Sequence, residues 1–399
     1  MKIQTRTSKS SPWYEIQDVA AISSPALLIF RQRVEENVKR MLAIAGGPAR
    51  LRPHIKTHKM REMLQMQLAL GITKFKCATL AEAEMAAMAG VSDLLLAYQP
   101  VGPNMEGAAE LLRAFPRTKF SVLCDDADLL GELSKRMCGL KRSRKGQGTD
   151  ARLEVLLDLD VGQHRTGMTP DGKAFELYHL MASLPGVKPG GLHAYDGHIG
   201  DSDPAARAAA CEAALEPVLA LRQQLTVARL PVPRLVVGGT PTFPIHARKS
   251  DRECSPGTCV FWDASYASRF ADMPFLPAAL VLTRVVSKPG ANRLCLDLGH
   301  KAIASEMPQP RVEFLNLEDS SFVTHSEEHL VVETSQAAKF NLGDCLYGVP
   351  RHICPTVALH AEAVVIENGK STSCWQVAAR DRQVKTGKFE HKKAIVGAK

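Results

Sequence analysis

Short apolar segments alternate with helix-forming segments between about residue 50 and residue 262. Eight of the apolar segments have the length of strands and are rich in branched or aromatic residues: Leu51–His54, Phe75–Ala78, Leu94–Ala97, Phe120–Leu123, Val155–Leu159, Gly191–Ala194, Leu235–Val237 and Thr258–Phe261. Good helix formers fill the intervals, as in Arg61–Leu70, Leu80–Ala89, Asp126–Cys138 and Ala205–Leu225. Continuous apolar strands that alternate with helices are typical of a parallel sheet covered by helices.

Eight strand–helix units within about 210 residues fit a closed (β/α)8 barrel of the TIM type. The alternative is an open, doubly wound sheet. No GxGxxG motif follows any of the early strands, which weakens that alternative. The sequence therefore predicts an α/β fold with a parallel barrel.

The pattern changes after residue 262. Two strand-like apolar segments, Ala278–Val286 and Arg293–Leu298, follow one another without a helix between them, and glycines separate the short segments that come later. We expect a smaller, mostly β domain here. The predicted domains are a barrel at 25–262 and a β domain at 263–399 together with 1–24; the early strand at Ala26–Phe30 can join the β domain.

The net charge of +8 comes from three basic segments, which are residues 1–11, the loop 141–150 and the tail from about residue 382. Because the remaining chain is slightly acidic, we expect solvated segments rather than a nucleic-acid-binding face. No apolar run approaches the roughly 20 residues that span a bilayer. Residues 1–14 lack the apolar centre of a secretory signal, and the ten cysteines show no CxxC motif. We expect a cytoplasmic protein with reduced thiols and no membrane association.

Two segments at predicted strand ends carry candidate chemistry. Lys56 lies in Arg52–Lys59 (RPHIKTHK), where a partly desolvated lysine can attack a carbonyl, although two surface lysines beside a turn would give the same letters. Arg165 lies in Asp158–Gly167 after the fifth predicted strand and can bind an anionic oxygen or remain an exposed loop arginine.

Two further segments suggest a phosphate and a metal. Gly238–Thr240 follows the seventh predicted strand, where barrels commonly bind phosphate, and Tyr266 can donate its hydroxyl to the same group. In an extended segment, His352 and Cys354 would point to one side and could bind one metal ion. An ordinary turn and a buried core pair are the alternatives for these two segments.

Together and in this order, these motifs resemble the family of D-threonine aldolases and D-serine dehydratases, which are pyridoxal-phosphate (PLP) enzymes of the alanine-racemase fold. The resemblance runs from about Ser24 to Arg380 and also includes Thr79–Glu84, Ala194–His198, Ser255–Phe261 and Pro350–Thr356. It implies a barrel plus a β domain, PLP at the carboxyl ends of the strands, and a divalent metal beside it.

The resemblance also assigns roles by position. Lys56 would form the Schiff base with PLP, and Gly238, Gly239, Thr240 and Tyr266 would hold its phosphate. Arg165 would contact the polar edge of the PLP ring, and Tyr195 would lie near the ring nitrogen. His352 and Cys354 would hold the metal. A thiolate ligand favours zinc over manganese or magnesium. The base would be His198 or a water on the metal.

The motifs combine features of two activities. His-x-Cys at 352–354 resembles the dehydratases, whereas Ala194–Gly197 and the seventh-strand motif resemble the aldolases. We expect a lyase that cleaves a small β-hydroxy-D-amino acid to glycine and an aldehyde. The alternative is D-serine dehydration to a keto acid and ammonia. A non-catalytic PLP carrier is the remote alternative, because such proteins resemble the barrel alone. The family also suggests a homodimer.

Overall fold

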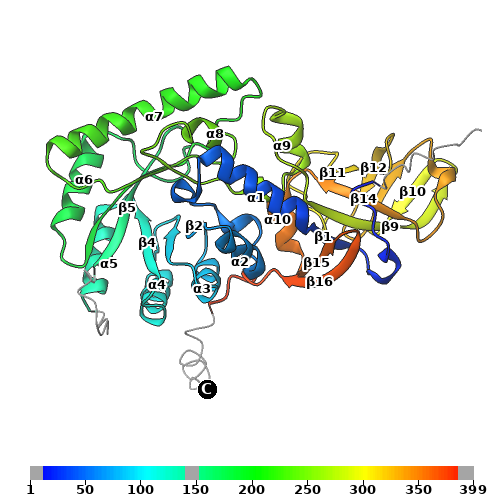
Figure 1. Ribbon diagram of the computed structural model, residues 1–399, viewed down its shortest axis with the longest axis horizontal. Helices are drawn as coiled ribbons and strands as arrows, with labels where there is room; N and C mark the ends of the chain where they lie inside the picture. Colours follow the sequence, from blue (N-terminus) through cyan, green and yellow to red (C-terminus); the bar gives the residue numbers. More distant parts are fainter. Residues whose placement is uncertain (1–11, 140–151, 385–399) are drawn as a thin grey trace, which may run out of the picture.

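The computed structural model describes residues 12–139 and 152–384, and places a parallel α/β barrel beside a mostly β unit (Figure 1). Within these residues the barrel sheet has seven parallel strands in sequence order: β2 (Lys74–Cys77), β3 (Asp93–Leu96), β4 (Lys119–Cys124), β5 (Leu153–Leu159), β6 (Val187–Ala194), β7 (Leu235–Val237) and β8 (Glu253–Cys254). The predicted α/β fold with a second, mostly β part is confirmed.

The predicted first strand closes the barrel through isolated bridges rather than a full ladder. Leu51 bridges Cys254 of β8 on one side, and His54 bridges Lys76 of β2 on the other. The predicted strand at Thr258–Phe261 is wrong, because the last strand is β8 and Thr258–Val260 forms a 3₁₀ helix. Pro256 has no N–H to donate to a sheet ladder, although its carbonyl still accepts the N–H of His54 at 2.9 Å.

Helices follow the strands and cover the outside of the barrel: α1 (Arg31–Ala45), α2 (Arg61–Ala69), α3 (Leu80–Met88), α4 (Pro103–Ala114), α5 (Ala127–Cys138), α6 (Gly172–Ser183), α7 (Pro204–Val227), α8 (Phe243–His246) and α9 (Ala264–Arg269). Side chains cap several of them. Asp203 accepts hydrogen bonds from the N–H groups of Ala205 and Ala206, and Pro204 occupies the first turn of α7, as its fixed φ angle favours. None of the described helices is both long and apolar enough to cross a membrane.

The inside of the barrel is layered. Phe75 and Cys77 of β2 pack in the outer core against the helices, so the alternate residues Lys74 and Lys76 face inward. The lower layer consists of paired charges: Arg52 with Asp93 and Glu253, Lys74 with Glu253, and Arg234 with Glu154. An apolar layer of Leu95, Leu123, Leu156 and Val236 forms a separate cluster.

The β unit is built on a nine-stranded sheet in the described part of the chain. Its strands are β1 (Ala26–Phe30), β9 (Ala279–Gly290), β10 (Arg293–Leu296), β11 (Val312–Phe314), β12 (Ser321–His325), β13 (Leu330–Glu333), β14 (Cys345–Pro350), β15 (Glu362–Glu367) and β16 (Lys370–Gln376), with helix α10 (Ile353–Leu359) between β14 and β15. The predicted placement of the early strand is confirmed, because β1 pairs with β9 and β15. The domain boundaries at 24/25 and 262/263 stay a prediction.

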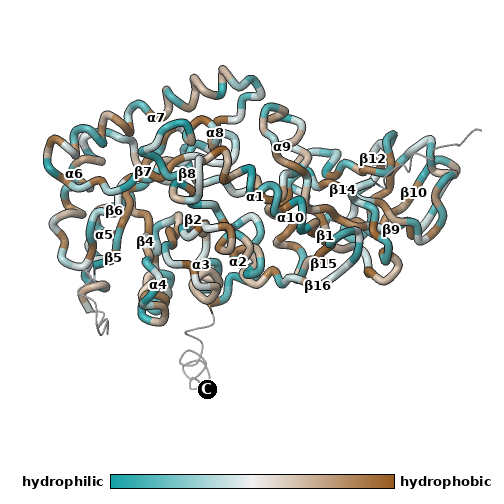
Figure 2. Tube along the Cα trace, in the orientation of Figure 1, coloured by the Kyte–Doolittle hydropathy of each residue, from teal (hydrophilic) through white to brown (hydrophobic). Residues whose placement is uncertain are grey.

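Figure 2 shows the hydropathy behind this arrangement, with hydrophobic residues along β1 and β4 and a mixed pattern along α7. The basic segments 1–11 and 141–150, and the tail beyond residue 384, lie outside the described residues.

Arg52 is buried at 0% exposure and contacts both Asp93 and Glu253 at 2.7 Å. Its removal leaves two carboxylates in the barrel without this partner, so Arg52→Ala is expected to lower the free energy of unfolding by roughly 3–5 kcal/mol. Urea unfolding measures the change. The control Arg31→Ala removes an exposed ion pair to Glu367 and is expected to cost about 1 kcal/mol or less. Equal losses in the two variants would contradict the role given to Arg52.

Candidate active site

A pocket at the carboxyl ends of the barrel strands brings together residues from distant parts of the sequence. Three of the predicted site residues, Lys56, Arg165 and Tyr195, line it. The rest of its lining consists of His54, Lys76, Ala97, Asp158, Leu159, Gln163, Thr166 and His193. This is the end of a parallel barrel at which the chemistry of such enzymes takes place.

Lys56 and Lys59 differ in their surroundings. Lys56 sits in the 3₁₀ helix Ile55–Thr57, where its N–H donates to Nδ1 of His54 at 3.3 Å. Its ammonium group has no ion-pair partner among residues 12–139 and 152–384, whereas the ammonium of Lys59 is paired with the buried Glu82. Of these two lysines, Lys56 is therefore the one available to a ligand in the pocket.

The loop after β5 presents Arg165 to the pocket. Asp160 accepts hydrogen bonds from the N–H groups of Gly162 and His164, and Asp125 accepts one from Gly167. The loop is thus fixed on both sides of Arg165, whose guanidinium carbon lies 5.2 Å from the centre of the Tyr195 ring. This distance is within the range of a cation–π contact.

Three polar side chains form a chain across the floor of the pocket. Nδ1 of His193 lies 2.6 Å from Oδ1 of Asp158, and its Nε2 lies 3.5 Å from Nζ of Lys76. Burial, with the nearby Lys56 adding to it, lowers the pKa of Lys76 to about 7, although Asp158 opposes the shift.

The loop Gly238–Thr240 follows β7, but its N–H groups are partly used inside the protein. Gly238 donates to the carbonyl of Ala194, and Gly239 donates to Asp196 and Thr242. Gly239 is also where the Tyr195 ring packs, since a Cβ there would lie 3.0 Å from Cε2 of that ring.

Two N–H groups that the sequence analysis did not single out converge on this loop. Gly257 and Thr258, which open the 3₁₀ helix after β8, each donate to Oγ1 of Thr240 at 3.1 Å. Backbone N–H groups at a short helix after strands seven and eight are the usual phosphate ligands of a barrel. The segment Ser255–Phe261 is one of the motifs of the resemblance, but its assignment as a strand gave no reason to single out these N–H groups.

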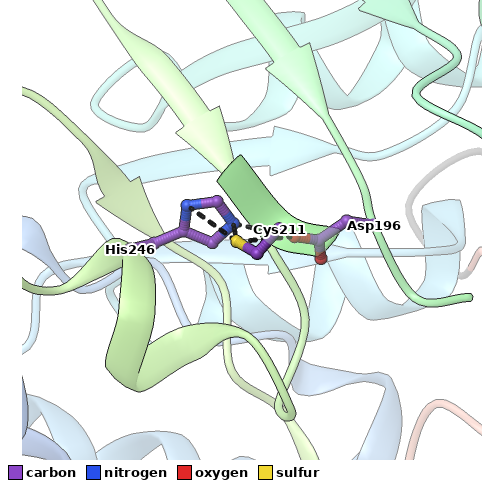
Figure 3. Close-up of side chains that lie close together, drawn as sticks. All are labelled: Asp196, Cys211 and His246. Carbon is purple, nitrogen blue, oxygen red and sulfur yellow. Dashed lines mark hydrogen bonds and ion pairs between the residues drawn. The ribbon is translucent and has the colours of Figure 1, made fainter. Parts of the chain in front are cut away.

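Asp196, Cys211 and His246 form a buried cluster with the residue types of a metal site (Figure 3). Oδ2 of Asp196 lies 2.7 Å from Nε2 of His246, whose Nδ1 lies 3.1 Å from the guanidinium of Arg252. Since arginine only donates, Nδ1 of His246 accepts and Nε2 donates to Asp196. Burial raises the pKa of Cys211 to about 12, so it is a thiol. The cluster therefore acts as a hydrogen-bond network that holds Gly239 and Thr242.

His352 and Cys354 also come together, but not as an extended segment. The expectation of a strand is wrong: His352 is the N-cap of α10 and Cys354 lies in its first turn. Asp263 accepts a hydrogen bond from the N–H of Ile353 at 3.1 Å, and this contact fixes the start of the helix.

The two side chains nevertheless interact. Burial opposes ionisation of both, but their mutual contact raises the pKa of His352 to about 9 and holds the pKa of Cys354 below its usual value, with Lys56 contributing to the second shift. Sγ of Cys354 lies 3.3 Å from Oγ1 of Thr57, the residue after Lys56. Nδ1 of His352 lies 2.5 Å from Glu306, which leaves Nε2 for another partner.

The two remaining predicted residues differ in position. Burial raises the pKa of Tyr266, and the nearby Tyr195 and Cys354 add to this shift, so its hydroxyl lies close to the pocket. His198 is exposed and is not part of the pocket lining. Its ring lies against Gly162, on the loop that carries Arg165.

A lysine without a counter-charge at the mouth of a parallel barrel is the arrangement of an enzyme that bonds covalently to an aldehyde or ketone. Residues 29–265 match the family profile of the alanine racemase N-terminal domain, and residues 278–366 match that of the putative serine dehydratase domain. Both halves of the chain thus match known families.

Whole-chain relatives agree with these matches. D-threonine aldolase of an Arthrobacter species is 31% identical over 369 residues, covering 91% of this chain and 94% of that protein. 3-Hydroxy-D-aspartate aldolase of Paracoccus denitrificans is 27% identical over 379 residues, covering 92% and 94%. The crystal structure of D-threonine aldolase from Filomicrobium marinum superposes with a TM-score of 0.81 at 26% identity, covering 90% of this chain and 96% of that one.

The chain belongs to the D-threonine aldolase and D-serine dehydratase family of alanine-racemase-fold enzymes. The family predicted from the sequence motifs is confirmed, and so is the class of enzyme, a lyase.

The buried ammonium of Lys76 leads to a pH-dependent prediction for the protein without cofactor. Below its folded pKa of about 7 both the folded and the unfolded states bind the proton, so the folded state bears the full cost of burying the charge. Between that pKa and the ordinary value of 10.5 only the unfolded state stays protonated, so the cost falls as the pH rises. Lys76→Met is therefore expected to stabilise the protein more at about pH 6 than at about pH 10.

Urea unfolding at the two pH values measures this difference. Lys74→Met serves as the control, because Lys74 faces the same barrel interior but is paired with Glu253 at 2.6 Å. It should show no comparable gain in stability at low pH. A gain for Lys76→Met that is equal at both pH values would rule out the buried charge as its cause.

Proposed function

We propose that the chain is a PLP- and divalent-metal-dependent lyase that cleaves β-hydroxy-D-amino acids to glycine and an aldehyde. One observation carries the proposal: the Cys354 thiol, partnered by His352, lies against Thr57, directly beside the unpaired Lys56. A covalent carbonyl site and a metal-binding pair therefore share one barrel mouth. The named aldolases among the relatives support the same reaction.

The residues fit pyridoxal phosphate. Lys56 offers an amine without a counter-charge, Arg165 offers a cation for the ring's phenolic oxygen, and Tyr195 packs between Arg165 and Gly239. The N–H groups of Gly257 and Thr258, which donate to Oγ1 of Thr240 in this structure, would exchange that acceptor for the phosphate, with Thr240 and Tyr266 beside them. When bound, PLP supplies the electron sink for breaking a bond at Cα.

The residues also fit a metal ion, for which zinc is the best candidate. Imidazole and thiolate are typical zinc ligands, and two protein ligands leave positions open for water or substrate. The contact between His352 and Glu306 orients the imidazole as an outer carboxylate does in metal sites. When bound, the ion supplies Lewis acidity toward a hydroxyl group. His198, at the rim beside Gly162, is the proposed acceptor of the hydroxyl proton.

Dehydration of D-serine or a related acid is the second candidate. The His-x-Cys pair and the match of residues 278–366 to the putative serine dehydratase domain favour it. Incubation of the holoenzyme with D-threonine and with D-serine separates the two: glycine and an aldehyde indicate the aldolase, and a keto acid with ammonia indicates the dehydratase. We also propose that the protein is a cytoplasmic homodimer. Absence of turnover with both substrates would contradict either lyase and leave a PLP carrier.

Borohydride reduction of the PLP-treated protein is expected to fix a pyridoxyl group on Lys56. Lys59 should remain unmodified because its ammonium group is held by the buried Glu82. Peptide mapping by mass spectrometry identifies the site. A pyridoxyl group on Lys59 in the wild-type protein would overturn the assignment.

Chelation of the metal is expected to abolish turnover while the absorbance of bound PLP persists, and added zinc should restore the activity. Cys354→Ala should bind zinc at least about tenfold more weakly. The matched control is Cys211→Ala, which removes a buried thiol from the cluster of Asp196 and His246 and should leave zinc binding unchanged. The opposite pattern, with zinc lost from Cys211→Ala alone, would move the metal to that cluster.

A further inference from the structure

We propose that Lys76 is a positioning residue for the bound cofactor: held by His193 and Asp158, its ammonium group provides a fixed positive charge beneath the pyridoxal ring and a hydrogen bond to it. The inference rests on the proposed function, since it assumes that PLP occupies the pocket. Its test is arranged so that the two can fail separately.

Lys76 is placed by its strand. It is 1% exposed and faces the barrel interior, because its neighbours Phe75 and Cys77 face the helices. Yet it lines the same pocket as Lys56, Arg165 and Tyr195. Its Nζ lies 5.5 Å from the centre of the Tyr195 ring. The side chain therefore reaches from the interior of the barrel to the floor of the cofactor pocket.

The direction of the hydrogen bond between Lys76 and His193 is defined. Asp158 accepts the Nδ1–H of His193 at 2.6 Å, which makes Nε2 the accepting nitrogen that faces Lys76. Burial lowers the pKa of His193, although Asp158 opposes the shift, so the ring is a neutral relay between the two charges. The chain of contacts fixes the ammonium group without placing a carboxylate directly against it.

Two nearby lysines, Lys74 and Lys59, differ from Lys76 because each has a carboxylate in direct contact. Lys74 is paired directly with Glu253, and Lys59 is paired directly with Glu82. In the described part of the chain His193 is the hydrogen-bond partner of the Lys76 ammonium, at 3.5 Å, so further N–H groups remain for a ligand. A buried cation held in this way is costly unless a ligand completes its interactions.

Charges from every side of the barrel mouth face this group. Those whose fields act on Lys76 are Lys56, Asp158, Asp196 and Arg52, and the pocket lining adds His54, His193 and Arg165. Of the groups that line the pocket, Lys56, Lys76 and Arg165 are basic and Asp158 is the one carboxylate. Such a floor favours an anionic oxygen on the ring and disfavours additional positive charge on the bound cofactor.

The experiment adds PLP to the cofactor-free full-length protein and follows its visible absorbance. Lys76→Met removes the charge and the donor, Lys76→Gln keeps a donor without the charge, and Lys74→Met is the control. The pH midpoint of the absorbance band is expected to move upward by about one unit or more in both Lys76 variants. PLP affinity is expected to fall about tenfold or more in Lys76→Met, the effect of one hydrogen bond to a charged group. Circular dichroism confirms that each variant is folded.

The outcomes separate the two hypotheses. If folded Lys76→Met and Lys76→Gln keep the wild-type midpoint, or if Lys74→Met shifts it equally, the role of Lys76 is overturned while the proposed function stands. If the wild-type protein forms no bound-cofactor band and no pyridoxyl-Lys56, the proposed function itself fails. A shifted midpoint in both Lys76 variants, with a normal midpoint in Lys74→Met, supports the fixed charge.

Discussion

The buried carboxylate of Asp263 joins the two parts of the molecule, and the geometry of the active site depends on it. It accepts hydrogen bonds from the N–H of Tyr266, at the start of α9, and from the N–H of Ile353, at the start of α10. Burial raises its pKa to about 6, although both backbone donors favour the ionised form. One side chain thus sets the position of Tyr266 on the barrel side and of His352 and Cys354 on the β side. Together with the 3.3 Å contact between Cys354 and Thr57, this connection fixes His352 and Cys354 in relation to Lys56.

The barrel keeps cations that are paired with carboxylates apart from cations that are free to contact a ligand at its mouth. Its lower layer neutralises cations directly, as Arg52 does with Asp93 and Glu253. An apolar layer around Leu95 and Leu156 comes next. At the mouth, Lys56 has no paired carboxylate among the described residues, and Lys76 has one only through His193. Cations in the lower layer are therefore neutralised by carboxylates, whereas the lysines at the mouth remain available to a ligand.

Much of this could be predicted from sequence, and the failures have physical causes. Continuous apolar strands such as Val155–Leu159 were predicted because they are buried on both faces. Thr258–Phe261 was assigned as a strand because it is apolar, but Pro256 and Gly257 redirect the chain into a 3₁₀ helix. The contacts of its N–H groups with Thr240 were missed for that reason.

The alternation of β2 explains why Lys76 was not predicted. Its sequence KFKC has the pattern of a strand with one face in solvent, because apolar residues alternate with lysines. In the barrel, however, the apolar face meets the helices and the lysines point inward. For His352 and Cys354 the pairing was right and the conformation was wrong, since His352 is an N-cap residue with extended dihedral angles, from which its side chain still meets that of Cys354 in the first turn.

The location of the proposed metal-binding pair at the start of α10 has an evolutionary consequence. This helix has seven residues, and it belongs to the β unit rather than to the barrel that lines the cofactor pocket. A substitution at position 354 can change the ligand from sulfur to oxygen without altering any residue that lines that pocket. Mutation can therefore change the reaction that is catalysed without changing the cofactor pocket. Closely related enzymes can then differ in their reaction while their barrels stay nearly the same.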